Sequence, residues 1–173
     1  MSGDAPRAMR IAVCAPGAAS DDELVTAGQI GRLLAEQGCV LVCGGLGGAM
    51  AAACRGAKDA GGTTIGIIPG YDERAANPWV EHVICTGLGQ ARNALVAATG
   101  HALIATGGGW GTLSEIGLGV RLGKPVVVIG GWAAALATAE ARGQIAAMDG
   151  DIFVAETPEE AVAAAIAAIT AAD

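Results

Sequence analysis

The chain has 173 residues, a length that fits one domain with a buried core. Its formal net charge is −7 and its 10 Lys and Arg residues are scattered, which argues against wrapping around a nucleic-acid backbone. Hydrophobic residues make up 53%, but the longest apolar runs, 126–137 and 161–172, are shorter than the ~20 residues that a membrane span needs. We expect a cytoplasmic protein that binds neither nucleic acid nor membrane, with one domain over 1–173 and a flexible tail at 1–9.

Short β-branched runs alternate with alanine-rich helical stretches in the first half of the chain. The patterns predict strands at residues 10–15, 40–43 and 63–68, and helices at 21–37 and 46–60. Residues 69–79 then combine turn residues and mixed charge without any period. This segment is expected to form a long loop of the kind that can cover a functional site.

The alternation continues in the second half of the chain. Strands are predicted at residues 82–85, 102–105, 125–129 and 152–154, and helices at 88–99, 112–122 and 158–171. The nearly continuous Val and Ile run at 126–129 is typical of strands that are buried on both faces. The expected fold is therefore α/β, a three-layer Rossmann-like domain with a mainly parallel sheet of about seven strands.

Two glycine-rich segments each follow a predicted strand and lead into a predicted helix. They are Gly44-Gly45-Leu46-Gly47-Gly48-Ala49-Met50 and Gly107-Gly108-Gly109-Trp110-Gly111-Thr112-Leu113-Ser114-Glu115. Glycine lets a ligand approach the backbone closely, and the following helix presents unpaired N–H groups and the positive end of its dipole. Both segments therefore predict an anion site of phosphate size. The second is more informative because it includes a hydroxyl and a carboxylate, Thr112 and Glu115.

Neither segment completes a dinucleotide-binding fingerprint. The positions that require its third glycine hold Met50 and Ser114, and neither segment follows the first strand, where that fingerprint belongs. An NTPase phosphate loop is excluded as well, since Gly123-Lys124 is followed by Pro125 and lacks the upstream glycine. NAD binding and ATP hydrolysis are both disfavoured.

The cysteines and histidines give little support to a metal site. The five cysteines contain no Cys-x-x-Cys pair and are expected to be small buried residues in a reducing compartment. Cys43, which borders the first glycine segment, is the best candidate for a thiol role. The chain has only two histidines, His82 and His101, which lie far apart in sequence, so no metal site is predicted.

Arg92 interrupts an otherwise apolar helical stripe, because it lies four residues after Leu88 and four before Val96. An inward-facing arginine requires a carboxylate or a bound anion as its partner. We therefore expect Arg92 to lie in a cleft, beside Glu115 or a ligand phosphate.

Glu115 falls in the first turn of its predicted helix, where the dipole favours the ionised form by about 0.3–1 kcal/mol at an exposed site. A carboxylate there can accept hydrogen bonds from sugar hydroxyls or stabilise a cationic sugar transition state, but it is a poor general acid. Residues 112–115 also fit a capping box, in which Glu115 only returns to the N–H of Thr112.

Structural alternatives exist for the glycine segments too. Residues 44–48 can be a tight strand-to-helix turn that allows close helix–sheet packing. Trp110 can stack on a base or cover the edge of the sheet. Both interpretations remain open at the level of sequence.

Four stretches together resemble the LOG-like superfamily of Rossmann-like proteins, over about residues 10–130. They are Gly44-Gly45-x-Gly47-Gly48-x-Met50, Thr64-Ile65-Gly66-Ile67-Ile68-Pro69, Arg92-Asn93 and Gly108-Gly109-Trp110-Gly111-Thr112-Leu113-Ser114-Glu115. Members were often labelled lysine decarboxylases, which is not their chemistry. The superfamily includes cytokinin-activating phosphoribohydrolases and molybdenum-cofactor carrier proteins.

The resemblance implies a catalytic pair in the hydrolases, Arg92 and Glu115, and a wider set of ligand-binding positions. That set is Gly44, Gly45, Gly47, Gly48, Met50, Pro69, Asn93, Thr106, Gly107, Gly108, Gly109, Trp110, Gly111 and Thr112. Two departures from the hydrolase pattern stand out, since Thr106-Gly107 replaces a usual Leu-Pro and Asn93 replaces a usual Lys. The Arg-Asn pair looks more like the carrier branch and its bacterial relatives.

The resemblance thus implies a binding or carrier protein for a phosphate-bearing, nucleotide-like or pterin-like ligand. It implies no required cofactor, with molybdenum cofactor or a nucleoside monophosphate as the bound ligand, and a homodimer. One alternative is a nucleoside 5′-monophosphate phosphoribohydrolase that cleaves the N-glycosidic bond. The other is a nucleotide-sensing module without turnover.

Overall fold

A computed structural model describes residues 8–146 and 151–172. Within these residues seven strands form one sheet in which every neighbouring pair is parallel, in the order β4-β3-β2-β1-β5-β6-β7. The strands are β1 (Arg10–Cys14), β2 (Val40–Cys43), β3 (Thr64–Ile68), β4 (His82–Cys85), β5 (Ala102–Thr106), β6 (Val126–Ile129) and β7 (Ile152–Ala155). Each lies within one residue of its predicted bounds, so the expected fold class is confirmed.

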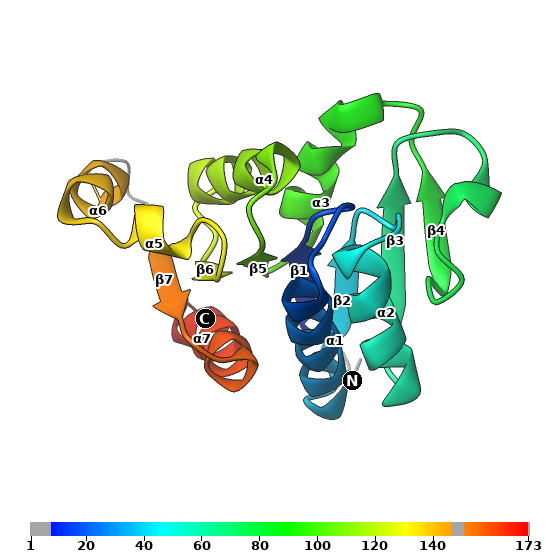
Figure 1. Ribbon diagram of the computed structural model, residues 1–173, viewed down its shortest axis with the longest axis horizontal. Coiled ribbons are helices and arrows are strands. Elements are labelled where there is room, and N and C mark those ends of the chain that lie inside the picture. The colour runs from blue at the N-terminus through cyan, green and yellow to red at the C-terminus, as the bar shows by residue number, and fades with distance from the viewer. Residues whose placement is uncertain (1–7, 147–150, 173) are drawn as a thin grey trace, which may run out of the picture.

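Helices cover both faces of this sheet. They are α1 (Asp21–Glu36), α2 (Ala49–Asp59), α3 (Asn93–Thr99), α4 (Trp110–Arg121), α5 (Ala133–Leu136), α6 (Ala139–Ala146) and α7 (Pro158–Ala172). Helices α1, α2 and α7 lie on one side, and α3 and α4 lie on the other (Figure 1). The result is a three-layer arrangement.

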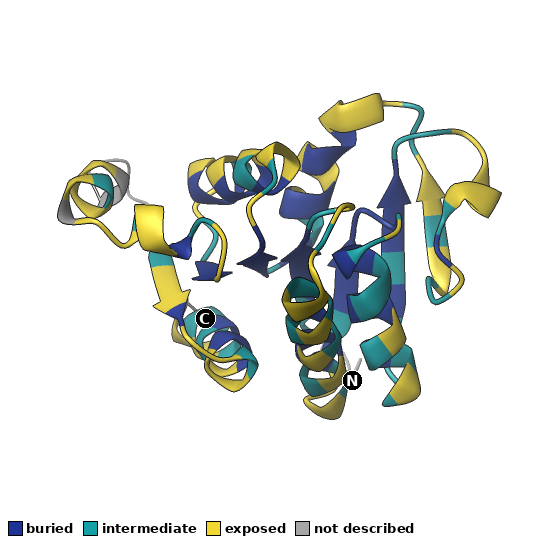
Figure 2. Cartoon of the chain, in the orientation of Figure 1, coloured by how far each residue is buried: buried dark blue, intermediate teal, exposed yellow. Residues whose placement is uncertain are grey.

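Successive residues of the central strands face alternate helical layers, which creates two cores. In β1, Ile11 and Val13 belong to the core under α1, α2 and α7, whereas Ala12 and Cys14 belong to the core under α3 and α4. All four are at most 1% exposed. The edge strands are more exposed (Figure 2), and Cys85 in β4 is exposed rather than buried, contrary to its predicted place. The other four cysteines are buried, as expected.

Several segments differ from the expectations. The predicted helix at 88–99 is split into a 3₁₀ helix, η2 (Gly89–Arg92), and α3, because Gly89 takes φ +54°, which an α-helix does not accommodate. Helices α5 and α6 were not predicted. The loop at 69–79 contains a 3₁₀ turn, η1 (Glu73–Ala75). Residues 1–7 of the expected tail lie outside the described residues, while Met9 packs on the core and accepts the Val40 N–H at 2.8 Å.

The order of the strands determines which edge of the sheet has a crevice for a ligand. The chain runs outward in one direction from β1 to β4 and in the other from β5 to β7, so the loops that follow β1 and β5 diverge. Such a switch point leaves a crevice at the carboxyl ends of the two strands. In the described part of the chain, no helix is long and apolar enough to cross a bilayer.

Candidate functional site

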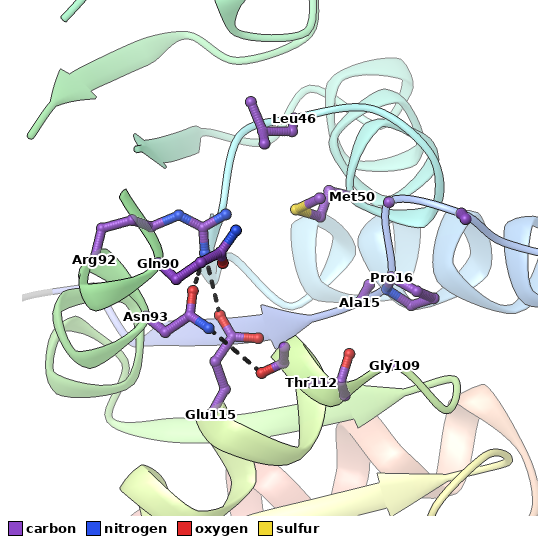
Figure 3. Close-up of a pocket in the computed structure, with 13 residues that line it drawn as sticks. Ala15, Pro16, Leu46, Met50, Gln90, Arg92, Asn93, Gly109, Thr112 and Glu115 are labelled. Atoms are coloured by element: carbon purple, nitrogen blue, oxygen red, sulfur yellow. Dashed lines mark hydrogen bonds and ion pairs between the residues drawn. The ribbon is translucent and has the colours of Figure 1, made fainter. Parts of the chain in front are cut away.

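A cavity of about 330 Å³ opens at this switch point (Figure 3). The loops after β1, β2 and β5 meet there with η2 and the first turns of α4. Its lining residues are Ala15, Pro16, Gly17, Ala18, Leu46, Met50, Gln90, Arg92, Asn93, Gly109, Gly111, Thr112 and Glu115. The volume is in the range of small-molecule sites.

Arg92 lies at the end of η2 and is only 6% exposed. Its Nη1 donates to Oδ1 of Asn93 and lies 3.6 Å from Oε1 of Glu115. The guanidinium packs directly against the backbone at Gly44, where a Cβ would come within 2.7 Å of the guanidinium carbon. Its Nε has no hydrogen-bond partner among the described residues. Arg92 is therefore a buried cation whose Nε–H is left without a partner in the described part of the chain.

Glu115 lies opposite Arg92, and its carboxylate points toward the guanidinium (Figure 3). Burial raises the pKa of Glu115 to about 7, whereas the nearby Arg92 charge and a hydrogen bond with Cys14 lower it. The expectation that Glu115 is a carboxylate at neutral pH therefore does not hold for a side chain with this pKa. It assumed an exposed side chain, but Glu115 is 5% exposed.

The capping-box interpretation of Glu115 is also wrong. Helix α4 begins at Trp110 with Gly109 as its N-cap, and no side chain caps it. Glu115 consequently lies in the second turn, where its side chain is free to face the cavity.

Thr112 supplies a second unpaired donor. It lies in the first turn of α4 and is 3% exposed, and its Oγ1 has no hydrogen-bond partner within the described ranges. Buried polar atoms in native proteins nearly always have a partner. Two residues that line one cavity and each hold an unpaired donor, a hydroxyl and a guanidinium N–H, are the arrangement expected of a site for an anion.

Asn93 holds the arginine in place. Its Oδ1 accepts from Arg92, while its Nδ2 donates to Oγ of Ser114 at 2.8 Å and to the carbonyl of Gly111 at 3.4 Å. Ser114 Oγ in turn donates to the same carbonyl at 2.7 Å. This chain of hydrogen bonds joins η2 to the first turns of α4.

The structure brings together only part of the predicted set. Both members of the predicted pair and five predicted binding positions line the cavity: Met50, Arg92, Asn93, Gly109, Gly111, Thr112 and Glu115. Thr106 and Gly107 line a neighbouring hollow of about 230 Å³ instead. The remaining predicted positions are not among the lining residues: Gly44, Gly45, Gly47, Gly48, Pro69, Gly108 and Trp110.

The glycines of the first segment serve packing, whereas Leu46 and Met50 of the same segment line the cavity. Gly48 takes φ +63°, and a Cβ there would collide with the carbonyl of Gly17. The N–H groups of Gly45 and Ala49 donate to Cys43 Sγ and to the carbonyl of Pro16. Two of its amides are therefore used inside the protein, as expected for a tight strand-to-helix turn.

The loop at 69–79 does not line the cavity either. Asn77, which is 8% exposed, ties the loop to the first glycine segment through its N–H to the carbonyl of Gly45 and its Nδ2 to the carbonyl of Leu46. Trp110 is 79% exposed and packs against Trp132 with ring centroids 5.6 Å apart.

Sequence reasoning missed the loop after β1. Residues 15–18 and Gln90 line the cavity, although none was singled out. A signal was present, since Pro16-Gly17 directly follows the first strand, the usual place for a phosphate-binding turn.

Comparisons with known proteins identify the family of this chain and agree with its fold. The SLOG cluster4 family model matches residues 8–162. An uncharacterised protein of Archaeoglobus fulgidus is 37% identical over 160 residues, which cover 89% of this chain and 92% of that protein. The molybdenum cofactor binding protein of Rippkaea orientalis is 34% identical with a TM-score of 0.81, covering 97% of this chain and 99% of that chain. The Moco carrier protein of Chlamydomonas reinhardtii is 37% identical with a TM-score of 0.82, covering 96% and 100%.

Proposed function

Because the chain belongs to the SLOG cluster4 family, we propose that it binds or carries a phosphate-bearing, nucleotide-like or pterin-like ligand, as the molybdenum cofactor carriers do. The suspected kinship with the LOG-like superfamily and its carrier branch is confirmed by the same matches. Molybdenum cofactor, a pterin with a phosphate ester, would be cargo here rather than a resident cofactor.

The observation that carries the proposal is that two residues of the cavity lining, Arg92 and Thr112, each hold a buried polar atom, Nε and Oγ1, without a hydrogen-bond partner among the described residues. Leaving a buried donor without a partner costs about 1–3 kcal/mol, so a ligand that satisfies both would regain that free energy on binding. A phosphate oxygen accepts from guanidinium and hydroxyl alike. Helix α4 begins at Trp110, so its first N–H groups add donors near Thr112.

The rest of the lining suits a ring system. Leu46 and Met50 lie across the cavity from Glu115 and present apolar surface (Figure 3). A ligand whose phosphate lies beside Arg92 and Thr112 would place its organic part against these two side chains. Methionine in particular adapts its shape to different partners.

Calorimetry with AMP and inorganic phosphate tests the proposal. Thr112→Val removes the hydroxyl at nearly constant volume, and it should weaken binding of both probes by about tenfold or more, because a hydrogen bond to a charged group is lost. Thr112→Ser keeps the hydroxyl and should bind close to wild type. Wild-type affinity in Thr112→Val would contradict a phosphate position at this site.

The cargo is identified by what the protein retains during purification. Protein from cells that make molybdopterin should carry pterin and molybdenum, measured by fluorescence after oxidation and by metal analysis. Retention of a nucleotide without pterin or molybdenum would contradict the carrier function and favour a sensing module.

A phosphoribohydrolase is the second candidate, and the pKa of Glu115 favours it. A carboxyl with a pKa of about 7 can act as a general acid at neutral pH. Hydrolysis would break the bond between C1′ and the base, transfer the hydroxyl of water to C1′ and give a proton to the departing base. Ribose 5-phosphate release from AMP by the wild type, lost in Glu115→Gln while AMP still binds, would support this activity. Absence of release by the wild type would rule it out for this substrate.

A further inference from the structure

We propose that the cavity takes up a proton together with its anion, so that Glu115 becomes protonated when a phosphate group settles beside Arg92. The inference rests on the proposed function, since it requires the phosphate to bind in this cavity. The proton is thus a second ligand of the site, and the affinity for a dianion depends on solution pH through Glu115.

The charged side chains on the cavity lining balance each other when Glu115 is ionised. Arg92 is the one cation and Glu115 the one carboxylate among the lining residues, and the remaining lining side chains are uncharged. The two side chains are 8% and 6% exposed and lie 3.6 Å apart. With Glu115 ionised, the guanidinium is already neutralised, and a dianion would bring two further negative charges into a poorly hydrated space. Protonation of Glu115 releases the guanidinium for the ligand.

The titratable groups around Glu115 keep the same protonation state at physiological pH, so Glu115 is the group that changes charge. Arg92 faces it from η2 and Cys14 from β1. The Cys43 thiol of β2 lies on the other face of the sheet, 3.4 Å from the Cys54 thiol, and acts on Glu115 only electrostatically. Burial raises the pKa of Cys14, and the Cys54 thiol and burial together raise the pKa of Cys43, so both thiols stay neutral at physiological pH. Arginine does not lose its proton in this range. Among these neighbours, Glu115 alone can respond.

Protonation of Glu115 costs little free energy at neutral pH. A pKa of about 7 means that the free protein already holds Glu115 partly protonated at neutral pH. The Cys14 thiol is within hydrogen-bonding contact of the carboxyl, so a polar neighbour is present in either protonation state. An incoming anion then shifts an equilibrium that is nearly balanced.

Sulfate is the probe of choice because it stays a dianion from pH 6 to 8, whereas phosphate itself titrates there. If only the protonated form binds sulfate well, a pKa of about 7 predicts roughly tenfold tighter binding at pH 6 than at pH 8. Glu115→Gln mimics the protonated carboxyl and should bind sulfate with nearly the same affinity at both values.

Glu36→Gln is the matched control. It removes one exposed carboxylate from the last turn of α1, at the opposite edge of the sheet, and should keep the wild-type pH dependence. Both histidines remain in all three proteins, so their titration cannot explain a difference between the variants.

Proton uptake by the wild type provides a measurement that does not depend on any variant. Calorimetry at pH 7 in two buffers of different ionisation enthalpy should show uptake of about half a proton per bound sulfate, rising toward one at pH 8. Sulfate binding without proton uptake, or with equal affinity at pH 6 and pH 8, would overturn the inference and leave the proposed function standing. Failure of sulfate and inorganic phosphate to bind at any pH would overturn both.

Discussion

Burial affects Glu115 more than the helix dipole does. At an exposed site the dipole would favour the carboxylate by at most about 1 kcal/mol. The rise in pKa from 4.5 to about 7 corresponds to about 3 kcal/mol against the ionised form, even with Arg92 3.6 Å away. Desolvation therefore decides the protonation state, and a local sequence pattern contains no information about it.

This raised pKa makes stability depend on pH. Between the unfolded pKa of 4.5 and the folded value of about 7, the folded state binds more protons than the unfolded state, so the free energy of unfolding falls as pH rises through that window. Urea denaturation of the wild type at pH 5 and pH 8 should show a loss of up to about 3 kcal/mol that Glu115→Gln does not show. Identical pH profiles for the two proteins would contradict a buried, proton-binding Glu115.

The sequence predicted that Arg92 lies beside Glu115 or a ligand phosphate, but not how the site holds the arginine. The helical spacing of Arg92 predicted a side chain that faces inward, and in the structure its guanidinium lies 3.6 Å from the Glu115 carboxylate. The close fit of the guanidinium against Gly44 depends on the segments after β2 and β4, which meet only in the folded chain, and its hydrogen bond to Asn93 depends on the local turn from η2 into α3.

At the scale of elements, α1 and α2 approach each other through glycine. A Cβ added to Gly31 would lie 2.8 Å from the carbonyl carbon of Ala53, so the two helices pack backbone to backbone. Gly31→Ala should lower the free energy of unfolding by about 1–3 kcal/mol, although alanine favours helices by about 1 kcal/mol.

The control for this prediction is Gly117→Ala, an exposed helical position where an added Cβ meets nothing within 4 Å. It should stabilise the protein by up to about 1 kcal/mol in the same urea titration. Equal stability of the two variants would contradict the close packing of α1 and α2.

The predicted bounds of strands and helices are accurate where the apolar pattern is strong. All seven strands appear within one residue of their expected bounds, because each is a short β-branched run between turn residues. The expected helix at 88–99 was too long, since Gly89 adopts a positive φ that composition alone does not reveal. Helices α5 and α6 escaped notice because their alanine- and glycine-rich sequence lacks a clear apolar period.

At the scale of the whole molecule, the strand order determines where the site lies. The alternation of strands and helices predicted a parallel sheet, but the position of β5 beside β1 is a long-range choice that brings residues 109–115 next to residues 15–18. This explains why the loop after β1 was overlooked. The expected homodimer remains a proposal, and light scattering of the purified protein measures it.

The central claim is that this cavity binds the phosphate of a small ligand, and a crystal structure of the protein with AMP tests it most directly. We predict phosphate density beside Arg92 and Thr112, at the N-terminus of α4, with the base toward Leu46 and Met50. Density for AMP elsewhere on the protein, with Arg92 and Thr112 still unpaired at saturating AMP, would contradict it.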